Sequence, residues 1–353
     1  MASVLVCNLP AFPQALTGPP PAANQQSAGR DDARTELETG TRLTRAGALG
    51  EAIPHLLAAQ SAGADPYATG VNLSICYIGT GAPARAVPLL ESLRSSGYRT
   101  PTTATLLVQA YIAVSRSADA FSTLESAVAS APADEKMFAY AADACTDHHQ
   151  YALGLRMMDL GVGKLPTSAR LHYEKAVFLA ELGNTDGARP EFDRAAQLEP
   201  DGYIGYLARV QKDLYDGKLS AANDLLHQAI QAGHRDYRIL SLLGTVLLHE
   251  GAAPGDPAFE EAESALEESA RQRPDFSATQ IALGKMYLMQ RRYREAVEHL
   301  QIGRALEPEN PAVYTSLATA YRALGDRQKA TEMSEELGRL LSREASSPAP
   351  VHP

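Results

Sequence analysis

A small residue returns at a nearly constant interval along almost the whole chain, and this spacing constrains the fold more than any other feature. The residue numbers of nine alanines differ in turn by 34, 34, 32, 36, 34, 40, 34 and 34. They are Ala52, Ala86, Ala120, Ala152, Ala188, Ala222, Ala262, Ala296 and Ala330. A chain of 353 residues without repeats would be expected to form two or three domains. The constant step instead indicates repeated units, each built from the same pair of elements.

A second small residue precedes most of these alanines. In five units it stands twelve residues earlier, and in two more it is displaced by two or six residues. These residues are Gly40, Ser74, Ala176, Gly284 and Ala318, with Ala208 and Gly244 as the displaced pair. Two antiparallel helices approach closely where both carry small side chains, and a larger one would cost about 1–3 kcal/mol. The spacing therefore predicts helix–turn–helix hairpins that cross at these residues.

The ends of the units carry helix signals as well. Proline lacks the amide N–H that a helix needs, so it ends the second helix of several units. These prolines are Pro66, Pro132, Pro166, Pro200, Pro274 and Pro308. The 40-residue step is explained by residues 251–257, which form an extra surface loop inside the seventh unit. Asp256 and Pro257 then provide a cap and a first-turn proline for the next helix.

This pattern resembles the tetratricopeptide repeat family, whose units are helix–turn–helix hairpins of about 34 residues. The segments "IALGKMYLMQRRYREAVEHLQIGRALEP", "SLATAYRALGDRQKA" and "ILSLLGTVLLHEG" carry the resemblance best. The chain departs from the family in having no tryptophan, and His172, Leu240 and Tyr314 stand where one is often found. The resemblance implies an all-α, right-handed α-solenoid of about nine hairpins over residues 33–343.

The two ends of the chain are expected to lie outside the solenoid. Residues 1–32 are typical of a flexible leader and residues 344–353 of a disordered tail. A secretory signal needs a basic start, yet no lysine or arginine occurs before Arg30. We therefore expect a soluble, cytoplasmic protein by default, and a periplasmic or secreted one if the leader is the remnant of a longer export signal.

Composition argues against several classes of function. The net charge is 32 − 42 = −10, which disfavours a nucleic-acid partner, and no apolar run is long enough for a transmembrane span. The segment "CTDHHQ" brings Cys145, Asp147, His148 and His149 together, but at a predicted turn where adjacent histidines seldom bind one ion. No phosphate-binding loop or nucleophile motif occurs. We expect no metal site, no cofactor, no catalytic residues and no enzymatic activity.

The resemblance implies a concave groove lined by the first helix of each unit. Projection of these helices predicts groove-facing side chains at Met137, Phe138, Tyr173, Tyr206, Arg209, Thr245 and Lys285. Aromatic residues and arginine often dominate binding energy, although Met137 and Phe138 are as readily explained by packing between units. Tyr206 and Arg209 share one helical face, and we expect them, with Tyr173, to hold an extended peptide or a partner helix.

The most direct functional interpretation is a non-catalytic adaptor that binds a protein segment in this groove. Two alternatives remain open. One is a structural assembly factor of the cell envelope that uses the edges or the convex face, and the other is a regulatory accessory subunit of an enzyme. The charged final helix is typical of a terminal cap, which favours a monomer.

The fourth unit fits the pattern least well, and we predict a softer joint over residues 133–166. Tyr140 stands where a small residue is expected, and Asp143 replaces the usual aromatic residue or leucine. Amide hydrogen exchange should therefore be faster there than in the neighbouring units. Uniform protection along the chain would contradict this prediction.

Overall fold

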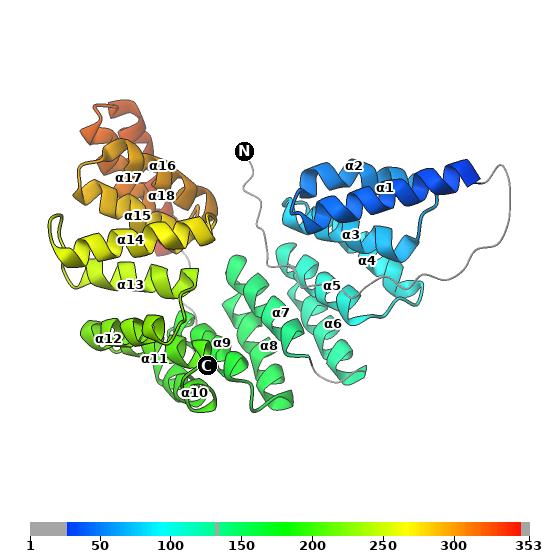
Figure 1. The fold of residues 1–353 in the computed structure, drawn as a ribbon, viewed down its shortest axis with the longest axis horizontal. Helices are drawn as coiled ribbons and strands as arrows, with labels where there is room; N and C mark the ends of the chain where they lie inside the picture. Colours follow the sequence, from blue (N-terminus) through cyan, green and yellow to red (C-terminus); the bar gives the residue numbers. More distant parts are fainter. Residues whose placement is uncertain (1–26, 131–133, 347–353) are drawn as a thin grey trace. The chain divides into compact units, whose positions relative to one another are not determined.

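The computed structural model describes residues 27–130 and 134–346, where all regular structure is helical (Figure 1). Eighteen helices form nine hairpins in these residues, so the predicted all-α solenoid is confirmed. The chain divides into two compact units between Leu198 and Glu199. They are called unit 1 and unit 2 below.

Within each hairpin a first helix is followed by a second helix. Unit 1 holds α1 (Ser27–Arg45), α2 (Leu49–Ser61), α3 (Pro66–Gly79), α4 (Pro83–Ser95), α5 (Pro101–Ala113), α6 (Ser117–Ser130), α7 (Glu135–Asp147), α8 (Tyr151–Lys164), α9 (Ala169–Glu181) and α10 (Thr185–Leu198). Unit 2 holds α11 (Tyr203–Tyr215), α12 (Leu219–Gln231), α13 (Tyr237–His249), α14 (Pro257–Gln272), α15 (Ser277–Met289), α16 (Tyr293–Leu306), α17 (Pro311–Ala323) and α18 (Arg327–Ser346). Each second helix packs on the first helix of its own hairpin, and in most cases also on the next first helix of the same unit.

The solenoid extends slightly beyond the predicted boundaries. Helix α1 begins at Ser27, before the expected start at residue 33, and α18 ends at Ser346. Residues 1–26 and 347–353, which include most of the expected leader and tail, lie outside the described residues, as do residues 131–133. The flexible ends and the export signal therefore stay predictions.

Several first helices begin with a capping side chain followed by proline. Asp65 accepts a hydrogen bond from the N–H of Ala68 at 2.6 Å and precedes Pro66. Asn310 accepts one from the N–H of Ala312 at 3.0 Å, again just before a proline. A proline that ends one hairpin can thus start the next, where its missing N–H leaves no helical hydrogen bond unmade.

The loop between α13 and α14 accounts for the 40-residue step, but its cap differs from the prediction. Pro257 occupies the first turn of α14 as expected. Asp256 does not bond to a helix N–H, because its carboxylate instead accepts a hydrogen bond from the N–H of Ala253 at 3.0 Å. The side chain of Asp256 therefore closes the loop rather than capping the helix.

Glycines at the crossing points let the two helices of a hairpin approach. A Cβ atom at Gly40 would lie 2.6 Å from the side chain of Leu56, and one at Gly284 would clash with Leu300 in the same way. Both leucines stand four residues after the repeated alanine and are fully buried. At these crossings the glycine leaves the space that the opposing leucine fills.

The crossing positions of the first helices follow one register throughout. They are Gly40, Ser74, Val108, Ala142, Ala176, Val210, Gly244, Gly284 and Ala318. All nine are buried, and their residue numbers differ by 34 throughout, except for one difference of 40 at the long loop. Gly244 therefore occupies the crossing position of its hairpin. Its apparent displacement from Ala262 arises only from the extra residues of the loop between them. In the sixth hairpin Val210 holds the register position, and the predicted Ala208 lies two residues earlier, where it is also buried.

The repeated small residue of the fourth hairpin is Gly154 rather than Ala152. Ala152 is exposed, whereas Gly154 is buried and a Cβ atom there would lie 2.5 Å from the ring of Phe178. With Gly154, the residue numbers of the repeated position rise by 34 at every step from Ala52 to Ala222. The assignment of Ala152 was wrong by two residues, because both candidates are small and the uneven steps of 32 and 36 were accepted in place of two steps of 34.

This correction changes the reason for expecting a soft fourth unit. In the true register Ala142, not Tyr140, occupies the crossing position. Cys145 stands where Tyr111 and Leu179 stand in the neighbouring hairpins, so a smaller side chain fills that place. Less apolar surface is buried there, and the softer joint stays a prediction on this basis.

The turns inside the hairpins share one backbone conformation. Each contains a residue with positive φ, namely Gly47, Gly81, Ser115, His149, Gly183, Gly217, Gly251, Arg291 and Gly325. These residues follow the same steps of 34 and 40. The left-handed conformation costs a non-glycine residue about 1–2 kcal/mol. Helix packing therefore holds Ser115, His149 and Arg291 in it.

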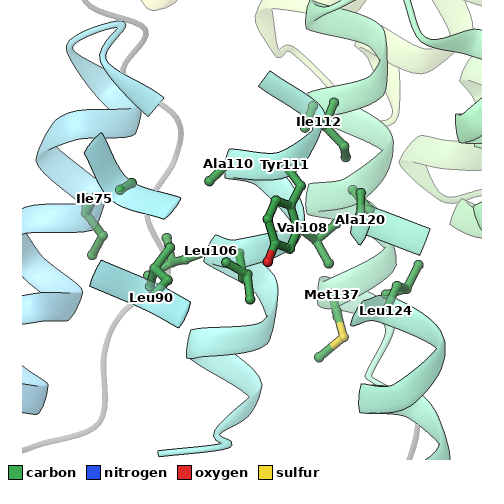
Figure 2. Packing of buried hydrophobic residues seen from close by; sticks show 14 of the residues in the cluster. Ile75, Leu90, Leu106, Val108, Ala110, Tyr111, Ile112, Ala120, Leu124 and Met137 are labelled. Carbon is green, nitrogen blue, oxygen red and sulfur yellow. The ribbon is translucent and has the colours of Figure 1, made fainter. Parts of the chain in front are cut away.

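The core of unit 1 is a continuous layer of apolar side chains contributed by successive hairpins (Figure 2). Leu90 of α4, Leu106 of α5 and Leu124 of α6 belong to this layer. Figure 2 shows Met137 of α7 in the same layer as Val108 of α5. No hairpin buries its apolar faces alone, so stability depends on the neighbours.

Replacement of Gly284 by alanine should lower the free energy of unfolding by about 1–3 kcal/mol, because the new methyl group meets Leu300. The matched control is Gly338→Ala in α18, where nothing lies within 4 Å of the added Cβ atom. Alanine should stabilise that helix by up to about 1 kcal/mol. Urea denaturation of both variants measures the difference, and equal effects would contradict the crossing model.

Candidate functional site

The first helices line the inner side of unit 2. Helix α15 packs on both α13 and α17, in addition to the second helices beside it. Among the described residues, α12, α14, α16 and α18 show no such packing on one another. A stack whose first helices lie closer together than its second helices curves toward the first helices. Helices α13, α15 and α17 therefore form its concave face, and α11 occupies the same place in the repeat.

Two rows of side chains follow this concave face from hairpin to hairpin. One row holds Gln211, Thr245, Lys285 and Thr319, and the other holds Leu214, Leu248, Leu288 and Arg322. Each residue of the second row stands three positions after one of the first row, so both rows share one face of their helices. All eight side chains are half-buried or exposed. We call these eight residues the inner surface of unit 2.

Two of the predicted groove residues, Thr245 and Lys285, lie on this inner surface. Thr245 is half-buried and Lys285 is exposed. The other six members were not predicted, although a signal for them was present. Applying the repeat step of 34 to Thr245 and Lys285 leads directly to Gln211 and Thr319.

Four other predicted groove residues are buried, which corrects their assignment. Phe138 is fully buried, and Met137, Tyr173 and Tyr206 keep only 6 to 8% of their surface exposed. In the true register Phe138 and Tyr206 occupy the same place as a set of buried residues in other hairpins. That set is His172, Leu240, Gln280 and Tyr314. These side chains pack between helices, so they present little surface to a partner.

Arg209 holds the start of unit 2 together. It donates hydrogen bonds to the carbonyl oxygens of Pro200 at 2.8 Å and Gly205 at 3.3 Å. Its guanidinium carbon lies 4.5 Å from the ring centroid of Tyr206, which adds a cation–π contact. Tyr173 belongs to unit 1, where its ring lies 5.9 Å from that of Phe192. Tyr206 and Arg209 thus contact each other as expected from their shared face, whereas Tyr173 packs within unit 1.

A polar network that the sequence analysis missed joins three helices of unit 1. Glu191 of α10 accepts a hydrogen bond from Lys175 Nζ at 2.7 Å and lies 2.5 Å from His172 Nδ1, while Lys175 contacts Asp159 of α8 at 3.0 Å. Burial raises the pKa of Glu191, but the bonds to Lys175 and His172 outweigh it and hold that pKa below its usual value. A signal existed, because two other hairpins pair residues 19 apart in the same way, His55 with Glu36 and His299 with Gln280.

The turn that contains adjacent histidines has a structural explanation. His149 is the left-handed residue of the turn between α7 and α8, and its Nδ1 lies 2.8 Å from the Tyr151 hydroxyl. Cys145 is buried, which raises the pKa of its thiol to about 12. No cluster of three or more potential metal ligands occurs in the part of the chain that the structure describes. In that same part, no helix combines the length and the apolar character needed to cross a bilayer.

The family model of the tetratricopeptide repeat matches residues 255–311 and 281–332. Among solved structures, the match to the APC/C hetero-tetramer Cut9–Hcn1 is 12% identical and covers 88% of this chain and 67% of that chain, with a TM-score of 0.54. Residues 255–332 therefore match the tetratricopeptide repeat family. A tetratricopeptide repeat protein from Parabacteroides merdae is 14% identical, over 72% of this chain and 98% of its own, with a TM-score of 0.51.

These likenesses show the fold of the present repeat protein. A search of curated proteins finds no match. Tetratricopeptide repeats serve in general as scaffolds for interactions between proteins. The fold of this chain supports that general role.

Replacement of Arg209 by alanine should lower the free energy of unfolding by about 1–3 kcal/mol, because two carbonyl groups lose a charged donor. Arg209→Lys should lower the free energy of unfolding by less than Arg209→Ala does, because lysine keeps the charge but lacks the planar guanidinium group. Arg294→Ala on α16 removes an exposed arginine and should change stability by less than about 0.5 kcal/mol. If urea denaturation gives similar values for Arg209→Ala and Arg294→Ala, the assigned role is wrong.

Proposed function

We propose that this chain is a non-catalytic adaptor that binds a segment of a partner protein on the inner surface of unit 2. The observation that carries the proposal is the pair of rows along the concave face. One row offers hydrogen-bonding groups at Gln211, Thr245 and Thr319, and the other offers apolar contact at Leu248 and Leu288. An interface needs both kinds of group, apolar burial for affinity and polar groups for orientation.

The spacing of the rows suits an extended segment. Packed helices lie about 8–10 Å apart, so the rows repeat at roughly that distance from one first helix to the next. An extended segment of the polyproline type repeats every three residues, or about 9.3 Å. Successive side chains of such a segment, three residues apart, would meet successive hairpins.

Tyr206 and Arg209 are not suitable positions for testing this proposal. Tyr206 is buried and Arg209 holds two carbonyl groups, so a double alanine variant would change folding as well as binding. Leu248 and Leu288 are better positions because they are half-buried on the inner surface itself.

The test uses random 16-residue peptides displayed on phage and selected on the wild-type chain. Enriched peptides should bind the Leu248→Ala/Leu288→Ala variant at least about tenfold more weakly in fluorescence anisotropy, because apolar contact is lost. Ile302→Ala on the second helix α16 is the matched control, since that side chain is 37% exposed. Circular dichroism at rising temperature confirms that each variant is folded.

Two results would contradict the proposal. The first is unchanged affinity for the variant with both leucines replaced. The second is an equal loss in Ile302→Ala, which would point to the outer face and to an assembly factor instead.

A further inference from the structure

The inner surface of unit 2 has a charge opposite to that of the chain as a whole. Helices α13, α15 and α17 contain no aspartate or glutamate. Each contains one lysine or arginine, at Arg238, Lys285 and Arg322. The chain carries a net charge of −10, so three consecutive first helices without an acidic residue set this face apart.

The acidic residues of this part of unit 2 lie on the second helices. Helix α14 alone contains five glutamates. Three of them pair with basic residues outside their own helix, since Glu261 contacts His227 at 2.9 Å, Glu268 contacts Arg235 at 2.5 Å and Glu263 contacts Arg292 at 3.2 Å. Acidic groups are thus concentrated on the outer side, and the basic groups of the first helices are left on the inner side.

Two of the inner cations are available to a ligand. Lys285 and Arg322 are exposed, and neither forms an ion pair within the described residues. Because α15 packs on α17, the two side chains lie on neighbouring helices. A carboxylate that approaches them has no internal ion pair to break.

Apolar side chains adjoin these two cations. Leu248 and Leu288 precede Arg322 in the same row, and Met289 in the last turn of α15 is 45% exposed. The surface therefore combines positive charge with apolar contact. A ligand that matches it must carry negative charge and apolar side chains within a short length.

We infer that the partner segment bound by unit 2 is acidic, with carboxylates that meet Lys285 and Arg322 and apolar side chains that cover Leu248 and Leu288. This inference rests on the proposed function and specifies the chemistry of its ligand. Charge complementarity selects the partner and speeds the encounter. A nucleic acid fits less well, because two free cations neutralise few phosphates and the chain around them is acidic.

The experiment compares charge variants with the peptides selected on the wild-type chain. Lys285→Gln/Arg322→Gln removes the two exposed inner cations, and Arg294→Gln/Arg327→Gln removes two exposed arginines from the second helices α16 and α18. The enriched peptides should combine Asp or Glu with apolar residues. Their affinity should fall about tenfold in the inner variant and stay unchanged in the outer variant. It should also weaken between 50 and 500 mM salt, a range chosen for screening.

The outcomes separate this inference from the proposed function. Enriched peptides without acidic residues, or with equal affinity for both charge variants, overturn the inference. If such peptides are still weakened by Leu248→Ala/Leu288→Ala, the proposed function stands alone. Failure to enrich any peptide overturns both.

Two further measurements examine other occupants of the surface. Sedimentation that shows a dimer lost only in Lys285→Gln/Arg322→Gln would assign the surface to a second copy. Tighter binding of a single-stranded DNA 16-mer than of any enriched peptide would assign it to a nucleic acid. Either result overturns the inference.

Discussion

The close approach of two helices at a small residue is the interaction on which the rest of this structure depends. At Gly40 and Gly284 the opposing leucine occupies the space that a Cβ atom would need. That contact sets the distance between helices, and the distance sets how each hairpin covers the next. The same kind of contact recurs at Gly244, and all nine crossing positions follow one register along the chain. The exposed face of the first helices is thus a consequence of packing on the opposite side of the same helices.

Much of the fold could be predicted because spacing is visible in the sequence, but the side chains exposed on the first helices were mostly not identified. The repeat length of about 34 residues identified the hairpins without any knowledge of their contacts. The assignment failed at Ala152 because Gly154 is also small, although both the even step of 34 and burial favour Gly154. Phe138 and Tyr206 were assigned to the groove because aromatic residues suit both a core and an interface. Phe138 and Tyr206 occupy the same repeat position as His172, and all three are buried. The structure therefore assigns them to the core.

The charge pattern of unit 2 differs between the first and the second helices of its hairpins. The second helices carry the acidic residues that keep the outer side hydrated, and many of these pair with basic residues of neighbouring hairpins. The first helices are free of acidic residues from α13 onward and face the concave side. Since successive helices alternate between the two sides, a change of composition in every second helix is enough to give the two faces opposite character. In unit 1 the first helices differ among themselves, because α3 and α5 contain no acidic residue whereas α7 and α9 do.

Each turn inside a hairpin has one residue in the left-handed conformation, and this residue is glycine, serine, histidine or arginine. The backbone conformation of each turn is therefore set by the two helices that it joins and not by the residue types in the turn. The seventh hairpin illustrates the consequence, because its turn is longer while the glycine that opens it, Gly251, retains its conformation. Extra residues can enter at this edge without disturbing the stacking beside it. The segment before Pro257 is accordingly a natural point for grafting a fluorescent tag or a second binding module onto the scaffold.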